Sequence, residues 1–274
     1  MGKNLNFVFW GTPEVARETL EILKASGYLP SLIITAPDAP AGRGMKMQES
    51  PATIFAKENN IPCLKPEKLD SDFTLKLSAF NFQLSVVIAY GKIIPENILN
   101  IPKLGSINVH YSLLPKYRGA SPVESAILNG DNETGVSIQK MVYKMDTGPV
   151  IISEKVEIGR DEKARELRER LIIIGAELLI KVLNQKEWHE TAQNESQATY
   201  CKKIQKEDGL LDLNDDPIKN YNKFRAYAHW PRTFFFQNNK RVIITEAILK
   251  GGQFIIKKVI PEGSKEITWE EFKK

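Results

Sequence analysis

The sequence of 274 residues is 42% hydrophobic and 26% charged, a composition typical of one or two globular domains that excludes a disordered or fibrous chain. No apolar run approaches the roughly 20 residues of a membrane-spanning helix, and residues 1–10 show no signal-peptide cleavage site. The two cysteines, Cys63 and Cys201, are too few for a disulfide framework or a cysteine-based metal site. We therefore expect a cytoplasmic protein without a membrane anchor.

The net charge of +4 is unevenly distributed. Residues 199–274 carry 15 Lys/Arg against 10 Asp/Glu, a net charge of +5, whereas the remaining residues carry 23 against 24. A basic C-terminal segment indicates a polyanionic partner. A solvated surface whose lysines keep the protein soluble explains the same charges equally well, so both interpretations stay open.

The first part of the chain alternates between short apolar runs and helical patterns. The runs of strand length are residues 6–10, 32–36, 61–64, 84–89 and 106–110. The helical patterns are residues 15–25, 52–58 and 72–79. Thr12 suits the N-cap of the first helix, with Pro13 at its first helical position. This alternation predicts βαβ units and a mostly parallel sheet with helices on both faces.

The later part of the chain changes character. Residues 135–142 and 150–158 alternate like strands, residues 163–183 form a long amphipathic pattern, and residues 184–198 are polar. After them come a helical pattern at 218–228 and strand patterns at 232–237, 241–249 and 253–260, with Asn238-Asn239 as a hairpin turn. We therefore expect a first domain at 1–183, a linker at 184–206 and a small β-rich domain at 207–274.

Asn108 and His110 lie at the end of one apolar strand pattern. They are two residues apart and therefore project from the same face of a strand, at the carboxyl end where open parallel sheets bind ligands. A polar pair in a buried strand needs partners, or it destabilises the fold. Taken alone, this pair is better explained as structural hydrogen bonding than as a catalytic site.

The surrounding motifs reverse that preference. Asn108-Val109-His110 is followed by Ser-Leu-Leu-Pro at 112–115, Tyr-Arg-Gly at 117–119 and Met-Asp-Thr-Gly at 145–148. This series resembles the signature of the folate-dependent formyltransferases. Collinear runs at 9–14, 37–44, 87–91, 203–209 and 230–231 resemble the branch of that family that formylates methionyl-tRNA, and together they cover almost the whole chain.

The resemblance implies a Rossmann-like catalytic domain, an OB-like C-terminal domain and a set of functional residues. Its catalytic residues would be Asn108, His110 and Asp146. An imidazole relays protons near neutral pH, an amide N–H stabilises a developing oxyanion, and a carboxylate orients the imidazole. These groups suit the attack of an amine on a formamide carbonyl, so the resemblance implies transfer from 10-formyltetrahydrofolate without a metal.

The resemblance also implies binding residues for both substrates. The folate pocket would include Ser112, Leu113, Leu114 and Pro115 and, at the pterin end, Val87, Ile88, Ala89 and Tyr90. Initiator methionyl-tRNA would be contacted by Arg43 and Lys46 in the irregular loop 37–51 and by Lys203 and Lys206. Periodicity alone says only that 87–90 is buried strand, that 112–115 ends a strand, and that 37–51 is a surface loop.

One feature qualifies these expectations, and two alternative functions stay open. Only three strand patterns follow Asp208, fewer than the five strands of an OB fold, so we expect a shortened C-terminal domain. An amino-sugar-nucleotide formyltransferase would use the same three catalytic residues and remains the alternative enzyme. A folate- or RNA-binding protein without catalysis is the third hypothesis, although binding alone needs no proton relay. The sequence does not decide the oligomeric state, and we expect a monomer.

Overall fold

The computed structural model describes residues 5–41 and 44–274. Contacts between residues divide the chain into two compact units. The first comprises residues up to Pro115 together with Val136–Glu154 and Leu171–Ala198, and the second comprises Lys116–Gly135, Lys155–Arg170 and Thr199–Lys274. The chain therefore crosses between the units several times. The sequence suggested consecutive domains at 1–183 and 207–274, and that division stays a prediction.

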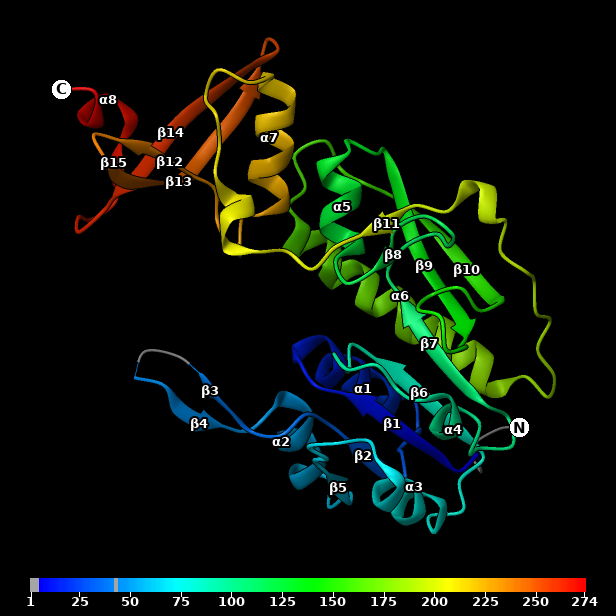
Figure 1. The fold of residues 1–274 in the computed structure, drawn as a ribbon. Helices are drawn as coiled ribbons and strands as arrows, with labels where there is room; N and C mark the ends of the chain where they lie inside the picture. The colour runs from blue at the N-terminus through cyan, green and yellow to red at the C-terminus, as the bar shows by residue number, and fades with distance from the viewer. Residues whose placement is uncertain (1–4, 42–43) are drawn as a thin grey trace. The chain divides into compact units, whose positions relative to one another are not determined.

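The first unit is built on a seven-stranded sheet with the order β10-β9-β7-β6-β1-β2-β5 (Figure 1). Its strands are β1 (Phe7–Gly11), β2 (Leu32–Ile34), β5 (Cys63–Leu64), β6 (Leu84–Ile88), β7 (Ser106–His110), β9 (Glu133–Lys140) and β10 (Val150–Glu157). The pairs from β5 through β7 are parallel, and β9 is antiparallel to β7. This mostly parallel sheet confirms the predicted α/β class. Its central strands are apolar because both faces are covered.

Helices connect the parallel strands. They are α1 (Glu14–Ala25), α2 (Pro51–Glu58), α3 (Ser71–Ser78) and α4 (Glu96–Leu99), and a further helix, α6 (Ala164–Asn184), follows β10. Thr12 was predicted to cap α1, but Pro13 occupies the N-cap. The Thr12 hydroxyl instead donates to the Tyr90 carbonyl at 3.2 Å and accepts the Ala36 N–H at 3.2 Å. It therefore ties together the chain segments that leave β1, β2 and β6.

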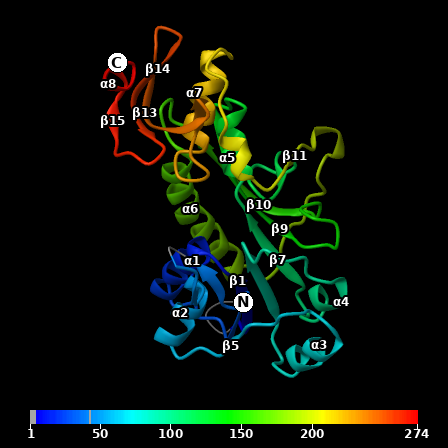
Figure 2. The same cartoon turned by 60° about the vertical axis from the view of Figure 1, so that its left-hand side comes forward.

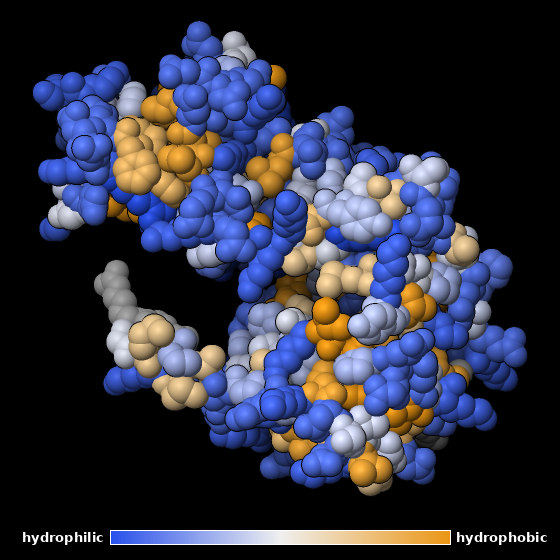
Figure 3. Space-filling model, in the orientation of Figure 1, coloured by the Kyte–Doolittle hydropathy of each residue, from blue (hydrophilic) through white to orange (hydrophobic). Residues whose placement is uncertain are grey.

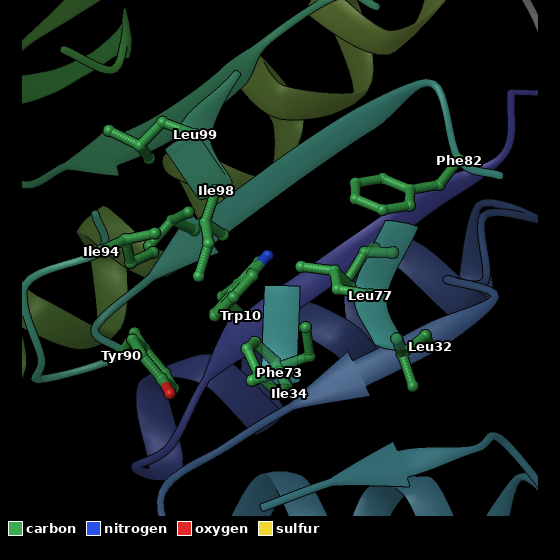
Figure 4. Close-up of a cluster of buried hydrophobic side chains, with 12 residues drawn as sticks. Trp10, Leu32, Ile34, Phe73, Leu77, Phe82, Tyr90, Ile94, Ile98 and Leu99 are labelled. Atoms are coloured by element: carbon green, nitrogen blue, oxygen red, sulfur yellow. The ribbon is translucent and has the colours of Figure 1, made fainter. Parts of the chain in front are cut away.

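A buried apolar cluster fills the space between the sheet, α3 and α4 (Figure 4). Trp10 lies at its centre and is fully buried, and its indole N–H donates to the Ser85 hydroxyl at 3.2 Å. Phe73 and Tyr90 meet the Trp10 ring edge-on, with centroids 6.0 and 5.1 Å away. On the other side of β7, Gly175 in α6 lies so close to Val109 that a Cβ would come within 3.0 Å of its side chain. These contacts fix β6 and β7 in place.

The loop 37–51 contains a hairpin that the sequence did not predict. Its strands are β3 (Ala39–Ala41) and β4 (Lys46–Gln48), which pair in antiparallel register. All three residues of β4 are exposed. Ser50 caps α2 by accepting the Thr53 N–H, which ends the loop.

The second unit contains a four-stranded antiparallel sheet, packed against α7 (Pro217–Ala226) and α8 (Trp269–Phe272) (Figure 2). Its strands are β12 (Phe234–Gln237), β13 (Lys240–Lys250), β14 (Gln253–Pro261) and β15 (Ile267–Thr268). The predicted turn is confirmed, because Asn238 and Asn239 have φ of 51° and 60°, as a tight hairpin requires. The sequence missed β15, whose two residues are too few to show alternation. One face carries the core of the unit, and Figure 3 shows apolar surface over β13 and β14.

The second unit also holds short elements between these parts. They are β8 (Arg118–Gly119), α5 (Pro122–Leu128), β11 (Tyr200–Cys201) and the 3₁₀ turn Lys206–Gly209. β8 pairs with β11 in parallel register. α5 packs against α7, so the segment after Pro115 belongs to the unit that contains the C-terminal sheet.

Candidate active site

A row of polar side chains lies across two neighbouring strands of the first unit. Asn108 pairs in register with Gln139, and His110 pairs with Ser137, between β7 and β9. Directly opposed residues of an antiparallel pair share one face of the sheet, so all four side chains project to the same side. His110, Ser137 and Gln139 are buried. This polar face lies beside the strands β1, β2 and β6, which are almost wholly apolar.

Asp146 meets this row from the turn that follows β9. Its carboxylate accepts a hydrogen bond from Gln139 Nε2 at 2.8 Å and a longer one from Asn108 Nδ2 at 3.5 Å. Its second oxygen, Oδ2, lies 3.7 Å from His110 Nδ1. The side chains of His110 and Asp146 are only 6% and 11% exposed, so water screens this pair weakly. The structure thus brings together the three residues that the sequence singled out.

The backbone at Asp146 is shaped by two unusual positions. Asp146 has φ of 54°, a left-handed conformation that aspartate tolerates better than most residues. Two residues later, a Cβ on Gly148 would lie 1.7 Å from the Lys140 carbonyl oxygen, so only glycine fits there. The turn therefore folds back tightly on the end of β9 and points the carboxylate at β7.

A cavity of about 200 Å³ opens beside Asp146 and Gln139. Its walls are mainly apolar and come from the segment after β6 and from the segment after β9: Lys92, Ile93, Ile94, Leu99, Met141, Val142, Tyr143 and Met145. The predicted pterin-binding run 87–90 lies immediately before this wall. Val87 and Tyr90 belong to the apolar core. Between them, Ala89 has φ of 49°, and the chain turns there before it reaches the residues that line the cavity.

The Ser-Leu-Leu-Pro segment leaves β7 next to the polar row. Ser137 Oγ donates to the Ser112 carbonyl at 2.8 Å and accepts the Leu114 N–H at 3.1 Å, which holds the segment against β9. Leu114 and Pro115 line a second cavity of about 390 Å³. Its other walls are the start of β10 and residues of the polar stretch after α6: Val150, Ile151, Ile152, Ser153, Thr191, Ala192, Gln193, Asn194 and Gln197.

The residues predicted to contact RNA are exposed where the structure describes them. Lys46 lies on the β3–β4 hairpin of the first unit, and Lys203 and Lys206 lie in the second unit. Arg43 lies outside the described residues. Within residues 5–41 and 44–274, no group of three His, Cys, Asp or Glu side chains could hold a metal ion, and no helix is long and apolar enough to cross a membrane.

Sequence reasoning missed two amides of the site. Gln139 donates to the Asp146 carboxylate, and Gln193 Nε2 donates to the Asp146 carbonyl at 2.9 Å and to the Gly148 carbonyl at 2.6 Å. The alternation of Ser137 and Gln139 with apolar Val136 and Ile138 gave a usable signal for a polar face. Gln193 gave none, because it stands among other amides in a polar stretch.

Comparison with known proteins identifies the family. The model of the formyl transferase family matches residues 3–183, and that of the formyl transferase C-terminal domain matches residues 203–258. The chain belongs to the formyl transferase family. Two methionyl-tRNA formyltransferases from this family resemble it over most of their length. That of Sulfurihydrogenibium sp. is 40% identical over 89% of this chain and 80% of its own, and that of Thermodesulfovibrio yellowstonii is 35% identical over 97% and 94%.

Solved structures of formyl transferases share the fold at lower identity. Methionyl-tRNA formyltransferase from Clostridium thermocellum superimposes with a TM-score of 0.65 at 18% identity, covering 96% of this chain and 99% of its own. The sugar 3N-formyl transferase WlaRD superimposes with a TM-score of 0.70 at 19% identity, covering 96% and 97%. At these identities the two structures show the fold and do not separate the acceptors.

Proposed function

We propose that this formyl transferase moves the formyl group of 10-formyltetrahydrofolate to the methionyl amino group of initiator methionyl-tRNA. The observation that carries the proposal is the convergence of Asn108, His110 and Asp146 beside an apolar cavity, with Asp146 3.5 Å from the amide and 3.7 Å from the imidazole. The identity of 35–40% to methionyl-tRNA formyltransferases supports the choice of acceptor. The cytoplasmic location and monomeric state stay predictions.

The cavity beside Asp146 suits one end of a folate. Its volume of about 200 Å³ is below the roughly 300–1,000 Å³ of a pocket for a whole drug-sized ligand, so it fits one ring system. Ile94, Leu99 and Met141 offer apolar walls for the faces of a flat ring, and the Gln139 and Asp146 side chains offer polar groups at its edge. The reduced folate supplies the formyl carbon. We assign the pterin end to this cavity.

The three side chains divide the chemistry between them. Attack by an amine turns the formyl carbonyl oxygen into an oxyanion, and the Asn108 amide, which donates one N–H to Asp146, retains a second N–H for this oxygen. The attacking amine loses a proton and the folate nitrogen gains one. His110 accepts and returns that proton, while Asp146 on its Nδ1 side fixes the orientation of the ring.

The acceptor is the part of the proposal that most needs a test. We would measure formyl transfer to methionyl-tRNA and to an amino-sugar nucleotide in parallel, at several salt concentrations. If the protein contacts about three to five phosphates of methionyl-tRNA, a plot of the logarithm of its association constant against the logarithm of salt concentration should have a slope of roughly −2 to −4. Transfer to the sugar nucleotide alone, or salt-insensitive use of methionyl-tRNA, would overturn the assignment of the acceptor.

A further inference from the structure

The polar stretch after α6 is attached to the first unit along its length. We call residues 185–198 the strap. Thr191 and Val150 exchange two backbone hydrogen bonds, of 2.8 and 2.9 Å, so the strap pairs with the start of β10. Before that point, the Trp188 indole donates to the Val182 carbonyl at 3.1 Å, and Glu190 pairs with Lys140 at 2.9 Å. The strap therefore has a defined register against the strands that carry the site.

Gln193 connects the strap to the turn between β9 and β10, residues 141–149, which carries Asp146. Within the described residues 190–197 it alone is not exposed, and its side chain lies inward. A single amide nitrogen, Nε2, lies 2.9 Å from the Asp146 carbonyl oxygen and 2.6 Å from the Gly148 carbonyl oxygen. The same nitrogen is 3.4 Å from Gln139 Oε1. One carboxamide thus bridges the carbonyls of Asp146 and Gly148 and contacts Gln139, which itself donates to the Asp146 carboxylate.

The turn needs such a bridge. Asp146 holds a left-handed backbone conformation with φ of 54°, which is less favourable than an ordinary conformation even for aspartate, so contacts that hold the turn stabilise it. Its carboxylate must remain within 3.5 Å of the Asn108 amide and 3.7 Å of the His110 ring to act on both. Without Gln193, two carbonyls would lose the N–H that joins them, and the turn could relax toward an ordinary backbone conformation. A shift of about 1 Å in a catalytic group can cost roughly 100-fold in rate.

We propose that Gln193 is a positioning residue that acts on formyl transfer through Asp146. This inference rests on the proposed function of the site. Gln193 binds main-chain carbonyls of the turn and supplies no proton to the reaction. Its removal should therefore lower kcat, whereas the Michaelis constants of both substrates should change little.

The first test compares Gln193→Ala and Gln193→Glu with the control Gln185→Ala, which removes an exposed glutamine from the same strap. We expect kcat to fall about 10- to 100-fold in both Gln193 variants, with Tm within about 2 °C of wild type and unchanged KM values. Gln193→Glu keeps the shape but places a carboxylate oxygen against two carbonyl oxygens, so it should not rescue. Gln185→Ala should behave as wild type. Wild-type kcat in Gln193→Ala would overturn the inference.

A double-mutant comparison separates positioning from a general structural effect. If Gln193 acts only through the Asp146 carboxylate, adding Gln193→Ala to Asp146→Asn should lower kcat less than twofold further. Losses that multiply would show that Gln193 acts independently of Asp146, and would contradict the inference.

A readout without turnover keeps this inference separate from the proposed function. The backbone amide resonances of Thr147 and Gly148 should shift in Gln193→Ala and stay in place in Gln185→Ala. Unchanged resonances in Gln193→Ala would overturn the positioning role, even if the wild type proved active. An inactive wild type with shifted resonances would instead overturn the proposed function and leave the structural coupling intact.

Discussion

Two groups of strands in the first unit's sheet bury different kinds of side chain. We call β1, β2 and β6 with their surroundings the apolar side, and β7 and β9 with theirs the polar side. Around β1, β2 and β6 the buried side chains are almost all apolar, and those on one face of the sheet pack around Trp10. Around β7 and β9 the buried positions include His110, Ser137 and Gln139. Most residues of both groups of strands are buried, so the difference lies in what each side chain contributes. The apolar side stabilises the fold, and the polar side holds the chemistry.

The polar side is possible because its groups have partners. An unpaired buried polar group costs free energy, whereas a bonded one contributes about 1 kcal/mol net. Ser137 bonds two backbone groups of the 112–115 segment, and Gln139 bonds the Asp146 carboxylate. The apolar side gains roughly 25 cal/mol for each Å² of apolar surface that it buries. Substitutions on the two sides should therefore fail in different ways.

The largest effect is expected from the catalytic side chains. Asn108→Ala, His110→Ala and Asp146→Asn should each lower kcat by about 10²- to 10⁴-fold, because each removes a group that stabilises charge or moves a proton in the transition state. Asn at position 146 keeps an oxygen that accepts the Gln139 hydrogen bond. Thermal unfolding of the same samples serves as the control and should stay close to wild type. If a variant kept more than about a tenth of wild-type turnover, the role proposed for the replaced side chain would be wrong.

Leu77→Ala should show the opposite pattern. Leu77 is fully buried in the cluster around Trp10, so the substitution leaves a cavity and should lower the free energy of unfolding by about 2–5 kcal/mol. Leu75→Ala, on the same helix at a position that is 72% exposed, is the matched control and should change stability by less than about 0.5 kcal/mol. Below its unfolding temperature, Leu77→Ala should retain wild-type kcat.

A smaller effect is expected at the basic residues of the second unit. Replacing Lys203 and Lys206 with Gln removes two exposed positive charges. The salt slope for methionyl-tRNA should become shallower by about 2, and KM for the tRNA should rise while kcat stays constant. Lys76→Gln, which removes one exposed lysine of α3, is the control for loss of positive charge elsewhere on the surface and should leave the slope unchanged. An unchanged slope would remove these lysines from the acceptor site.

The smallest effect on stability is expected at Tyr90, whose hydroxyl is a polar group on the apolar side. Its buried hydroxyl has no hydrogen-bond partner among the described residues, and burial raises its pKa from 10.0 to about 12. The folded state thus favours the neutral phenol. The free energy of unfolding therefore falls as pH rises from about 10 to 12, because the phenol of the unfolded chain ionises first. Tyr90→Phe should change stability by less than about 1 kcal/mol at pH 7. In urea unfolding at pH 11 it should lose less stability than wild type.

The sequence predicted the elements of the site better than their mutual placement. The end of an apolar strand located Asn108 and His110, and the family motif added Asp146. The partner Gln139 required the register between β7 and β9, which no local pattern contains. Gln193 depended on where a polar stretch packs, and such stretches carry no periodic signal.

Backbone conformation explains the remaining differences. The run 87–90 reads as continuous buried strand, yet Ala89 adopts φ of 49° and the chain turns, so Lys92–Ile94 line the cavity. Thr12 has the composition of an N-cap, but its hydroxyl is used by Tyr90 and Ala36 instead. Local propensity identifies a residue that can cap a helix, and tertiary contacts decide whether it does.

The most direct test of the division between the two sides is one plot of log kcat against the free energy of unfolding. It would include wild type, Asn108→Ala, His110→Ala, Asp146→Asn, Leu77→Ala and Leu75→Ala, with methionyl-tRNA as acceptor. We predict two separate groups: the catalytic variants fall in kcat at constant stability, and Leu77→Ala falls in stability at constant kcat. A single line on which kcat declines with stability for all variants would contradict the account.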